Sequence, residues 1–360
     1  DLVYNMMRAW QGGFGAVSVE GMVSPAYVVA RPNGDVPTRV VEQLLRTPNA
    51  VEEMRRHSRG VTDFRLRLYW DEFKNLSIVL PPEREQTAIA AFLDRETAKI
   101  DALVAEQRRL IELLKEKRQA VISHAVTKGL NPDAPMKDSG IEWIGEVPAH
   151  WEVKALKHVI TKIEQGWSPQ CDNEPAPDGQ WGVLKVGCGN GDRFDPNEQK
   201  SLPLEVEPQP LYEIKSGDIL MSRGNTLELV GSATYVEKVR PKLLLCDLLY
   251  RFRAQAGISE SGFLVFSLRS PNVRFQIERD ATGSSASMKK IGQGTIRSLV
   301  LPLPPLDEQQ AIISSIKVQT EDLDTLTAEA QRAIDLLQER RTALISAAVT
   351  GQIDVRKEVA

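Results

Sequence analysis

Apolar residues recur every three or four positions through two long stretches of the chain, residues 83–128 and 306–350. In the first stretch the recurring positions are Ile89, Leu93, Ile100, Leu103, Leu110, Leu114 and Val121. In the second they are Ile312, Ile316, Leu323, Leu326, Ala330, Leu337 and Leu344. The spacing is close to the 3.5-residue repeat of a coiled coil, with polar interruptions at Glu96, Gln107 and Lys117. Both stretches are predicted to be single helices, because each is far longer than the ~11–12 residues of an ordinary amphipathic helix.

The two stretches also repeat each other in sequence. "LPPEREQTAI" begins at Leu80 and "LPPLDEQQAI" begins at Leu303, 223 positions later. At this offset residues 105–127 align without a gap to residues 328–350, and half of the positions from 80 to 127 are identical. Proline followed by acidic residues suits the first turn of a helix, whose free N–H groups favour negative charge. Gly129 and Gly351 are predicted to end the two helices.

Residues 151–305 have the shorter, mixed pattern of a globular α/β (α+β) domain. Strand-like segments separated by glycine, proline and asparagine occur at 182–187, 218–223, 232–237 and 248–254. Residues 261–281 predict a helix that is interrupted or ended near the "SPN" stretch at 270–272. A final strand is predicted to run into the Pro-Pro pair at 304–305, directly before the second long helix.

The repeat predicts the domain organisation. "RTPN" (46–49) aligns with "RSPN" (269–272), and "DLVYN" (1–5) fits "DILMS" (218–222) if one small insertion is allowed. The chain is interpreted as two copies of a globular domain followed by a helix, the first copy lacking most of what corresponds to 151–217. The predicted parts are a truncated first globular domain (1–82), the first helix (83–128), a linker (129–150), the second globular domain (151–305), the second helix (306–350) and a tail (351–360).

Chain order also suggests how the helices pack. The second helix begins near the place where the first one ends, so the simplest packing is an antiparallel two-helix coiled coil. At 1.5 Å per residue each helix is about 65 Å long. The two globular domains are expected at opposite ends of this pair, related by a pseudo-twofold axis.

Composition narrows the function classes. The 360 residues carry a net charge of -4, so a nucleic-acid role requires a local basic patch rather than a basic protein. No apolar run approaches the ~20 residues that span a bilayer, and no secretory signal opens the chain. Cys171, Cys188 and Cys246 have no CxxC spacing, which favours a reducing compartment. The sequence therefore predicts a cytoplasmic protein.

Catalytic chemistry has one candidate. Asp178, Glu198 and Lys200 have the outline of a metal-dependent nuclease motif, but the segment around Glu198 is expected to be a loop instead of an apolar strand. The sequence contains no GxxxxGK[ST] phosphate loop, no complete GxGxxG leading into a helix and no Asn-Pro-Pro-aromatic methyltransferase motif. Its four histidines and three cysteines do not have metal-ligand spacing. A binding scaffold is favoured, with no metal and no cofactor of its own.

Loops of the second globular domain combine glycine with residue types that contact phosphates and bases. The candidate DNA contacts are Gln165, Trp167, Lys185, Arg223, Asn225, Ser284, Ser285, Lys289 and Lys290. Each loop taken singly also fits a solvated turn, and the two lysines equally fit ordinary surface charge. On the helices, four apolar residues fall beside the predicted seams and would widen the stripe for partner helices. These candidate docking residues are Ile111, Leu113, Ile334 and Leu336.

The combination resembles the specificity subunit of type I restriction–modification systems. The resemblance is carried by "LPPLDEQ" before a long helix ending in "LISAAVTGQI", and by "DSGIEWIGEVPAHWEVKALK" at the start of a globular domain. "GMVSPAYVVARP" and "KSGDILMSRGN" also resemble the target-recognition strands of that family. The similarity covers essentially the whole chain, and the motifs occur in duplicate.

The resemblance implies that each globular domain reads one half of a bipartite double-stranded DNA site. The paired helices would act as a ruler and would dock two methyltransferase subunits, through which restriction subunits join. S-adenosylmethionine, ATP and magnesium would then be used by those partners and not by this chain. The departures are the incomplete first domain and the mildly acidic charge. Two alternatives remain open, a stand-alone nuclease and a coiled-coil adaptor that does not bind DNA.

Overall fold

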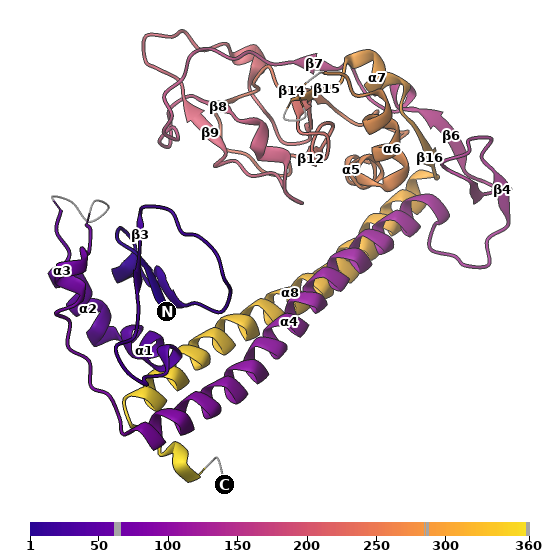
Figure 1. Cartoon of the computed structure of the whole chain (residues 1–360). Coiled ribbons are helices and arrows are strands. Elements are labelled where there is room, and N and C mark those ends of the chain that lie inside the picture. The colour runs from indigo at the N-terminus through magenta and orange to yellow at the C-terminus, as the bar shows by residue number, and fades with distance from the viewer. Residues whose placement is uncertain (61–65, 284, 286–287, 358–360) are drawn as a thin grey trace. The chain divides into compact units, whose positions relative to one another are not determined.

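In the computed structural model the described residues are 1–60, 66–283, 285 and 288–357. The chain divides into two compact units. The first unit comprises Asp1–Leu113 and Leu326–Ala360, and the second comprises Leu114–Thr325. Two long helices, α4 (Glu83–Lys128) and α8 (Leu306–Val349), contribute a section to each unit (Figure 1). Among the described residues no helix is long and apolar enough to span a bilayer.

The second unit is built on an antiparallel sheet with the strand order β12-β10-β14-β7. These strands are β7 (Glu164–Gln165), β10 (Ile219–Ser222), β12 (Ala233–Tyr235) and β14 (Leu249–Phe252). Three helices accompany the sheet, namely α5 (Ser261–Arg269), α6 (Pro271–Asp280) and α7 (Gln293–Ser298). The predicted break between two helices is confirmed at Ser270, whose extended backbone ends α5 and whose following proline begins α6.

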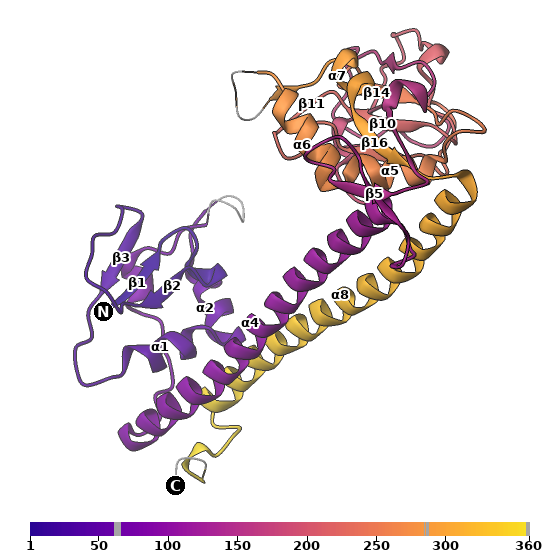
Figure 2. The same ribbon diagram turned by 90° about the vertical axis from the view of Figure 1, so that its right-hand side faces the viewer.

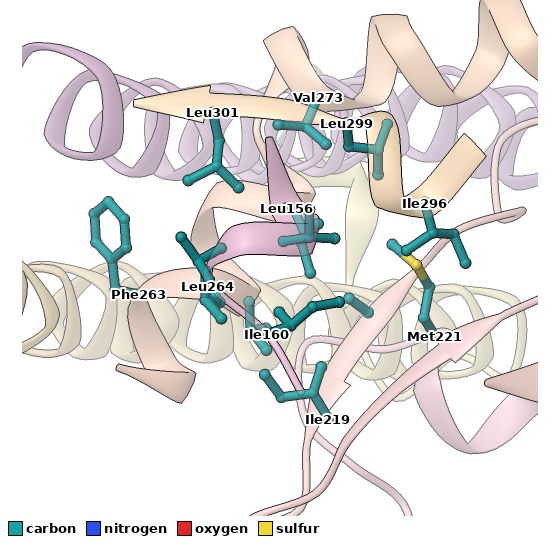
Figure 3. Packing of buried hydrophobic residues seen from close by; sticks show 14 of the residues in the cluster. Leu156, Ile160, Ile219, Met221, Phe263, Leu264, Val273, Ile296, Leu299 and Leu301 are labelled. Carbon is teal, nitrogen blue, oxygen red and sulfur yellow. The ribbon is translucent and has the colours of Figure 1, made fainter. Parts of the chain in front are cut away.

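A single apolar core holds these elements together. The run "SGFLVFSL" buries Phe263, Leu264 and Leu268 completely. Figure 3 shows Leu156 in the middle of this core, between Leu301 and Ile219. Leu301 lies on β16 (Val300–Leu303), which pairs with β6 (Glu152–Ala155) directly before α8 begins. The predicted last strand is thereby confirmed, and it fixes the place where α8 leaves the core.

A second, smaller core lies in the same unit. It is formed around the three-stranded sheet β13-β8-β9 and contains Val183, Leu243 and the buried Cys188 and Cys246. The strands are β8 (Gly182–Leu184), β9 (Gln199–Ser201) and β13 (Leu243–Leu244). Burial raises the pKa of both thiols, so they pack as apolar groups. Two short ladders complete the unit, β4 (Met136–Asp138) with β5 (Glu146–Pro148), and β11 (Gly224–Asn225) with β15 (Lys289–Lys290).

The first unit has a three-stranded antiparallel sheet in the order β2-β1-β3 (Figure 2). Its strands are β1 (Leu2–Asn5), β2 (Phe14–Ala16) and β3 (Tyr27–Ala30), and its helices are α1 (Thr38–Leu45), α2 (Pro48–His57) and α3 (Trp70–Phe73). The strand order matches β12-β10-β14 of the second unit. α1 and α2 begin 223 positions before α5 and α6, so the sequence repeat is matched element by element here.

The sections of α4 and α8 contact each other within each unit. In the first unit Ile100, Val104 and Ile334 form a buried cluster, and Arg341 pairs with Asp101 at 2.9 Å. In the second unit Arg118 of α4 forms an ion pair with Asp324 of α8. Each section of α4 therefore contacts the section of α8 that belongs to the same unit.

The predicted seam is wrong at three positions. Leu103, Leu110 and Leu326 are 45%, 41% and 47% exposed. The alternating spacing of three and four residues instead continues through Val104, Gln107 and Ile111, and a polar residue holds one of these positions. The prediction considered apolar residues only. It therefore assigned leucines on the exposed side to the seam, in place of the buried positions beside them.

Candidate nucleic-acid interface

Residues from two predicted loops meet at the β11–β15 ladder. Gly224 pairs with Lys290 and Asn225 pairs with Lys289 in antiparallel register. The N–H of Ile291 donates to the carbonyl of Arg223 at 3.0 Å, which extends the pairing by one residue. The ladder places one arginine, one asparagine and two lysines of the prediction side by side.

The arginine is held against a neighbouring segment. The N–H of Arg223 donates to the carbonyl of Leu248 at 2.7 Å, and its guanidinium Nη1 lies 3.4 Å from the carbonyl oxygen of Asp247. Asp247 in turn accepts a hydrogen bond from the hydroxyl of Ser168. The segment 245–248 therefore joins Arg223 to the loop that follows β7.

That loop contains two further candidates. Gln165 is exposed and pairs with Tyr250 at the edge of the large sheet. The N–H of Trp167 donates to the carbonyl of Leu245 at 2.9 Å, and its indole packs against the second core. A Cβ at Gly166 would lie 2.2 Å from the carbonyl oxygen of Leu245, so only glycine allows this close approach.

The Asn225 side chain is oriented by two hydrogen bonds. The N–H of Thr226 donates to its Oδ1 at 2.9 Å, and its Nδ2 donates to Oδ1 of Asn190 at 3.0 Å. An amide has two donor hydrogens and two acceptor lone pairs on its oxygen. One donor and one acceptor position of Asn225 are thus left for another molecule.

The two lysines differ in their surroundings. Nζ of Lys289 donates to the carbonyl of Gly283 at 2.6 Å and the side chain is half-buried, whereas Lys290 is exposed. Ser285 is exposed as well, and Ser284 lies outside the described residues. Lys185 is carried by a different element, since it follows β8 and its N–H donates to the carbonyl of Glu198. We call Gln165, Trp167, Arg223, Asn225, Lys289 and Lys290 the recognition cluster.

Comparison with known proteins adds the family. Residues 148–336, which include the whole recognition cluster, match the family described as "Type I restriction modification DNA specificity domain". The chain belongs to this family. One relative, the "Type I restriction enzyme EcoEI specificity subunit" of Escherichia coli, is 30% identical over 62% of this chain and 38% of its own length. The EcoKI specificity subunit of E. coli strain K12 is 26% identical over 78% of this chain and 58% of its own length. The chain thus spans about half the length of these relatives.

A solved structure has the same fold. It is described as the "structural basis underlying complex assembly" and conformational transition of the type I R-M system. The match has a TM-score of 0.71 and covers 97% of this chain and 81% of that chain, at 17% sequence identity. The mixed α/β architecture with long helices is accordingly shared with that solved structure.

Sequence reasoning missed several residues that surround the cluster of this specificity domain. Asn190 and Asp247 contact cluster members directly, and Ser168 is hydrogen-bonded to Asp247. Asn190 lies in "GCGNG" (187–191), which resembles a glycine-rich nucleotide loop but does not complete a GxGxxG motif. Its partner Asn225 lies 35 positions away, so no local pattern could connect the two.

The first unit has counterparts of part of the cluster. The N–H of Leu68 donates to the carbonyl of Met6, as that of Ile291 does to the carbonyl of Arg223. The bridge between Arg59 and Arg67 likewise matches the bridge between Thr282 and Lys290. This correspondence places Arg67, which is exposed, where the second unit has Lys290. At the repeat offset of 223 Arg67 aligns with Lys290, so the sequence contained this signal.

The structure corrects the expectation for two of the four docking candidates. Ile334 is only 4% exposed in the cluster with Ile100, and Ile111 packs against that cluster. They stabilise the contact between α4 and α8 and do not widen an exposed stripe. Leu113 and Leu336 are 44% and 64% exposed, so they remain available to a partner.

The nuclease alternative is not supported by its geometry. Gln199–Ser201 form strand β9, so the expectation of a loop there was wrong, and Lys200 pairs with Val183. Asp178 is exposed, outside any strand. Within the described part of the chain, no group of three acidic, histidine or cysteine side chains is placed to hold a metal ion.

Proposed function

We propose that the chain is a DNA-binding specificity subunit of a type I restriction–modification complex, and that the recognition cluster reads one half of its target. The observation that carries the proposal is the assembly of this cluster from three separate segments within the residues that match the family. Arginine and asparagine are the side chains that best form paired hydrogen bonds with guanine and adenine in the major groove. Lysines beside them suit the phosphates.

The second half of a bipartite site is assigned to the first unit. Its sheet has the same strand order, and Arg67 occupies the position equivalent to Lys290 of the cluster. We propose that α4 and α8 form an antiparallel coiled coil whose pseudo-twofold axis relates the two halves. The length of this coiled coil would set the distance between the half-sites.

Partners supply the chemistry in this proposal. Leu113 and Leu336 present exposed apolar surface on the long helices, which suits docking of two methyltransferase subunits. Restriction subunits would join through them, in the cytoplasm where host DNA is found. S-adenosylmethionine, ATP and magnesium are then bound by the partners, and this chain acts without catalysis. The metal-dependent nuclease and the coiled-coil adaptor remain the competing functions.

The decisive experiment uses the complete gene expressed with its methyltransferase. Sequencing of methylated positions in the host is expected to give one bipartite motif. The assembled complex should then bind a duplex with this motif at least ~10³-fold more tightly than a random duplex at physiological salt. Equal affinity for both duplexes would contradict the proposal, and metal-dependent cleavage by the purified chain would favour the nuclease. Absence of any salt-sensitive DNA binding would favour the adaptor.

A further inference from the structure

One loop of the second unit, residues 187–193, connects the recognition cluster to the helices behind it. In the middle of this segment, directly after the 3-10 helix Val186–Gly189, Asn190 accepts the hydrogen bond from Asn225. Two residues later Asp192 pairs with two arginines. Its Oδ1 lies 3.2 Å from Nη1 of Arg269 on α5, and its Oδ2 lies 3.3 Å from Nη2 of Arg118 on α4.

Both arginines are firmly held, so the loop is tied to fixed points. The Arg269 side chain is 20% exposed, and it also donates to the carbonyls of Ala233, at 2.7 Å, and Gly191. Burial lowers the pKa of Arg269, whereas the Asp192 carboxylate favours its charged form. Arg118 is 21% exposed and also pairs with Asp324 of α8. Asp192 thus links the loop to α4 and α5 simultaneously.

Asn190 fixes the orientation of the Asn225 side-chain amide. Because the N–H of Thr226 must meet an acceptor, the oxygen of the Asn225 side chain faces the backbone. Its Nδ2 then faces Asn190, which can only accept through its own Oδ1. Without Asn190 the amide would keep one restraint and could rotate about its side-chain bonds.

We propose that loop 187–193 is a positioning element for base recognition, in which Asn190 orients Asn225 and Asp192 holds the loop in place. The inference deepens the proposed function and rests on it. The remaining donor and acceptor of Asn225 are the pair that would meet N7 and N6 of an adenine. Orientation before binding removes the entropic cost of ordering this side chain on the target.

The test uses the assembled methyltransferase complex and measures its affinity for the target and for random DNA. Asn190→Ala is expected to weaken target binding about 3- to 10-fold, the effect of one hydrogen bond, with random binding unchanged. The same change in an Asn225→Ala background should have no further effect, because the oriented side chain is already absent. Asn190→Asp keeps the acceptor, so it should keep the wild-type ratio of target to random affinity even if its charge weakens both.

Asp192→Ala tests the ion pairs that hold the loop in place. It should lower the ratio of target to random affinity several-fold, whereas Asp178→Ala, which removes the same charge from an exposed site of the same domain, should leave the ratio unchanged. Thermal unfolding of each complex checks that the domain stays folded. If the losses of target affinity caused by Asn190→Ala and Asn225→Ala were additive, this inference would be contradicted while the proposed function would stand. A wild-type complex without preference for its methylated motif would overturn the proposed function, and this inference with it.

Discussion

Neighbouring residues of β15 differ in what they can contribute to DNA binding. Nζ of Lys289 is hydrogen-bonded to Gly283, whereas Lys290 is exposed. If both neutralise phosphates, replacing them together with alanine should weaken binding to all duplexes and make the negative slope of log K against log salt shallower by about 2. Lys290→Ala alone should account for about 0.9 of this change, and Lys238→Ala, another exposed lysine, should leave the slope unaltered. A double variant with the wild-type slope would remove this ladder from the interface.

Arg223 and Asn225 should act on specificity instead. If their side chains reach base edges, Arg223→Ala or Asn225→Ala is expected to cost about 1–3 kcal/mol on the target duplex and little on random DNA. Titration of the assembled complex with both duplexes at one salt concentration measures this difference. Equal losses on the two duplexes would show that these residues contact the backbone.

Residue types alone predicted which loops could contact DNA, but they did not predict that two of these loops pair as strands. Arg223, Asn225 and the two lysines were selected because glycine-rich loops with polar and cationic residues suit DNA. Their pairing joins positions 64 residues apart, and a local pattern carries no register for such a ladder. The candidate Lys185 follows a strand of a different sheet. For the same reason the contacts of Asn190 and Asp192, which lie outside the cluster, could not be predicted from a local pattern.

At the scale of elements, the helices were predicted almost to the residue while their contact face was not. Periodicity predicted 83–128 and 306–350, and the structure has Glu83–Lys128 and Leu306–Val349. The seam failed because polar side chains occupy contact positions. Gln107 is half-buried, and it lies between Val104 and Ile111 in the seam. At the position of Arg118 the two helices are joined by an ion pair with Asp324 instead of an apolar contact.

This corrected seam predicts a contrast in stability between two nearby residues of α8. Ile334→Ala removes a side chain that is 4% exposed, so it should lower the free energy of unfolding by about 2–5 kcal/mol. Leu336→Ala removes one that is 64% exposed and should change it by less than ~0.5 kcal/mol. Urea unfolding of the purified chain, followed by circular dichroism, compares the two. Similar midpoints for both variants would argue against the contact assigned to Ile334.

The same exposed positions should matter for assembly. Replacing Leu113 and Leu336 together with aspartate is expected to prevent co-purification of the methyltransferase, because two charges would be buried in an apolar contact. The matched control replaces Leu204 and Leu211, which are 90% and 72% exposed in the second unit, and should retain the partner. Circular dichroism should show both double variants folded. Undiminished co-purification of the helix variant would place the docking surface elsewhere.

At the scale of the molecule, the sequence repeat predicted the architecture because two similar stretches of sequence are expected to form two similar units. Matching helices in the two units begin 223 positions apart, and the two sheets share their strand order. The repeat could not predict the small sheet β13-β8-β9 and its own core, since this part has no second copy to align. Its strands have two or three residues, too few for a periodic pattern.

The proposed ruler can be tested by lengthening both helices together. Within the first unit, the ion pair of Asp101 with Arg341 and the cluster of Val104 and Ile111 with Ile334 and Leu337 place residues 105–111 against residues 331–337. Duplicating both stretches adds one heptad to each helix, which keeps the contact faces aligned. The rise of about 10.5 Å corresponds to about 3 base pairs, so the methylated motif should keep its two half-sites and gain about three positions between them. Sequencing of methylated sites in cells with the lengthened subunit reports the spacing directly.

The control for this experiment lengthens one helix only. A heptad added to α4 without its counterpart in α8 shifts every contact beyond the insertion, so Arg118 would no longer meet Asp324. This variant should lose methylation at any spacing, because the two recognition surfaces can no longer be held at a defined separation. Methylation at the original spacing by the doubly lengthened subunit would contradict the ruler. It would mean that the DNA or the partner subunits, and not α4 and α8, determine how far apart the half-sites lie.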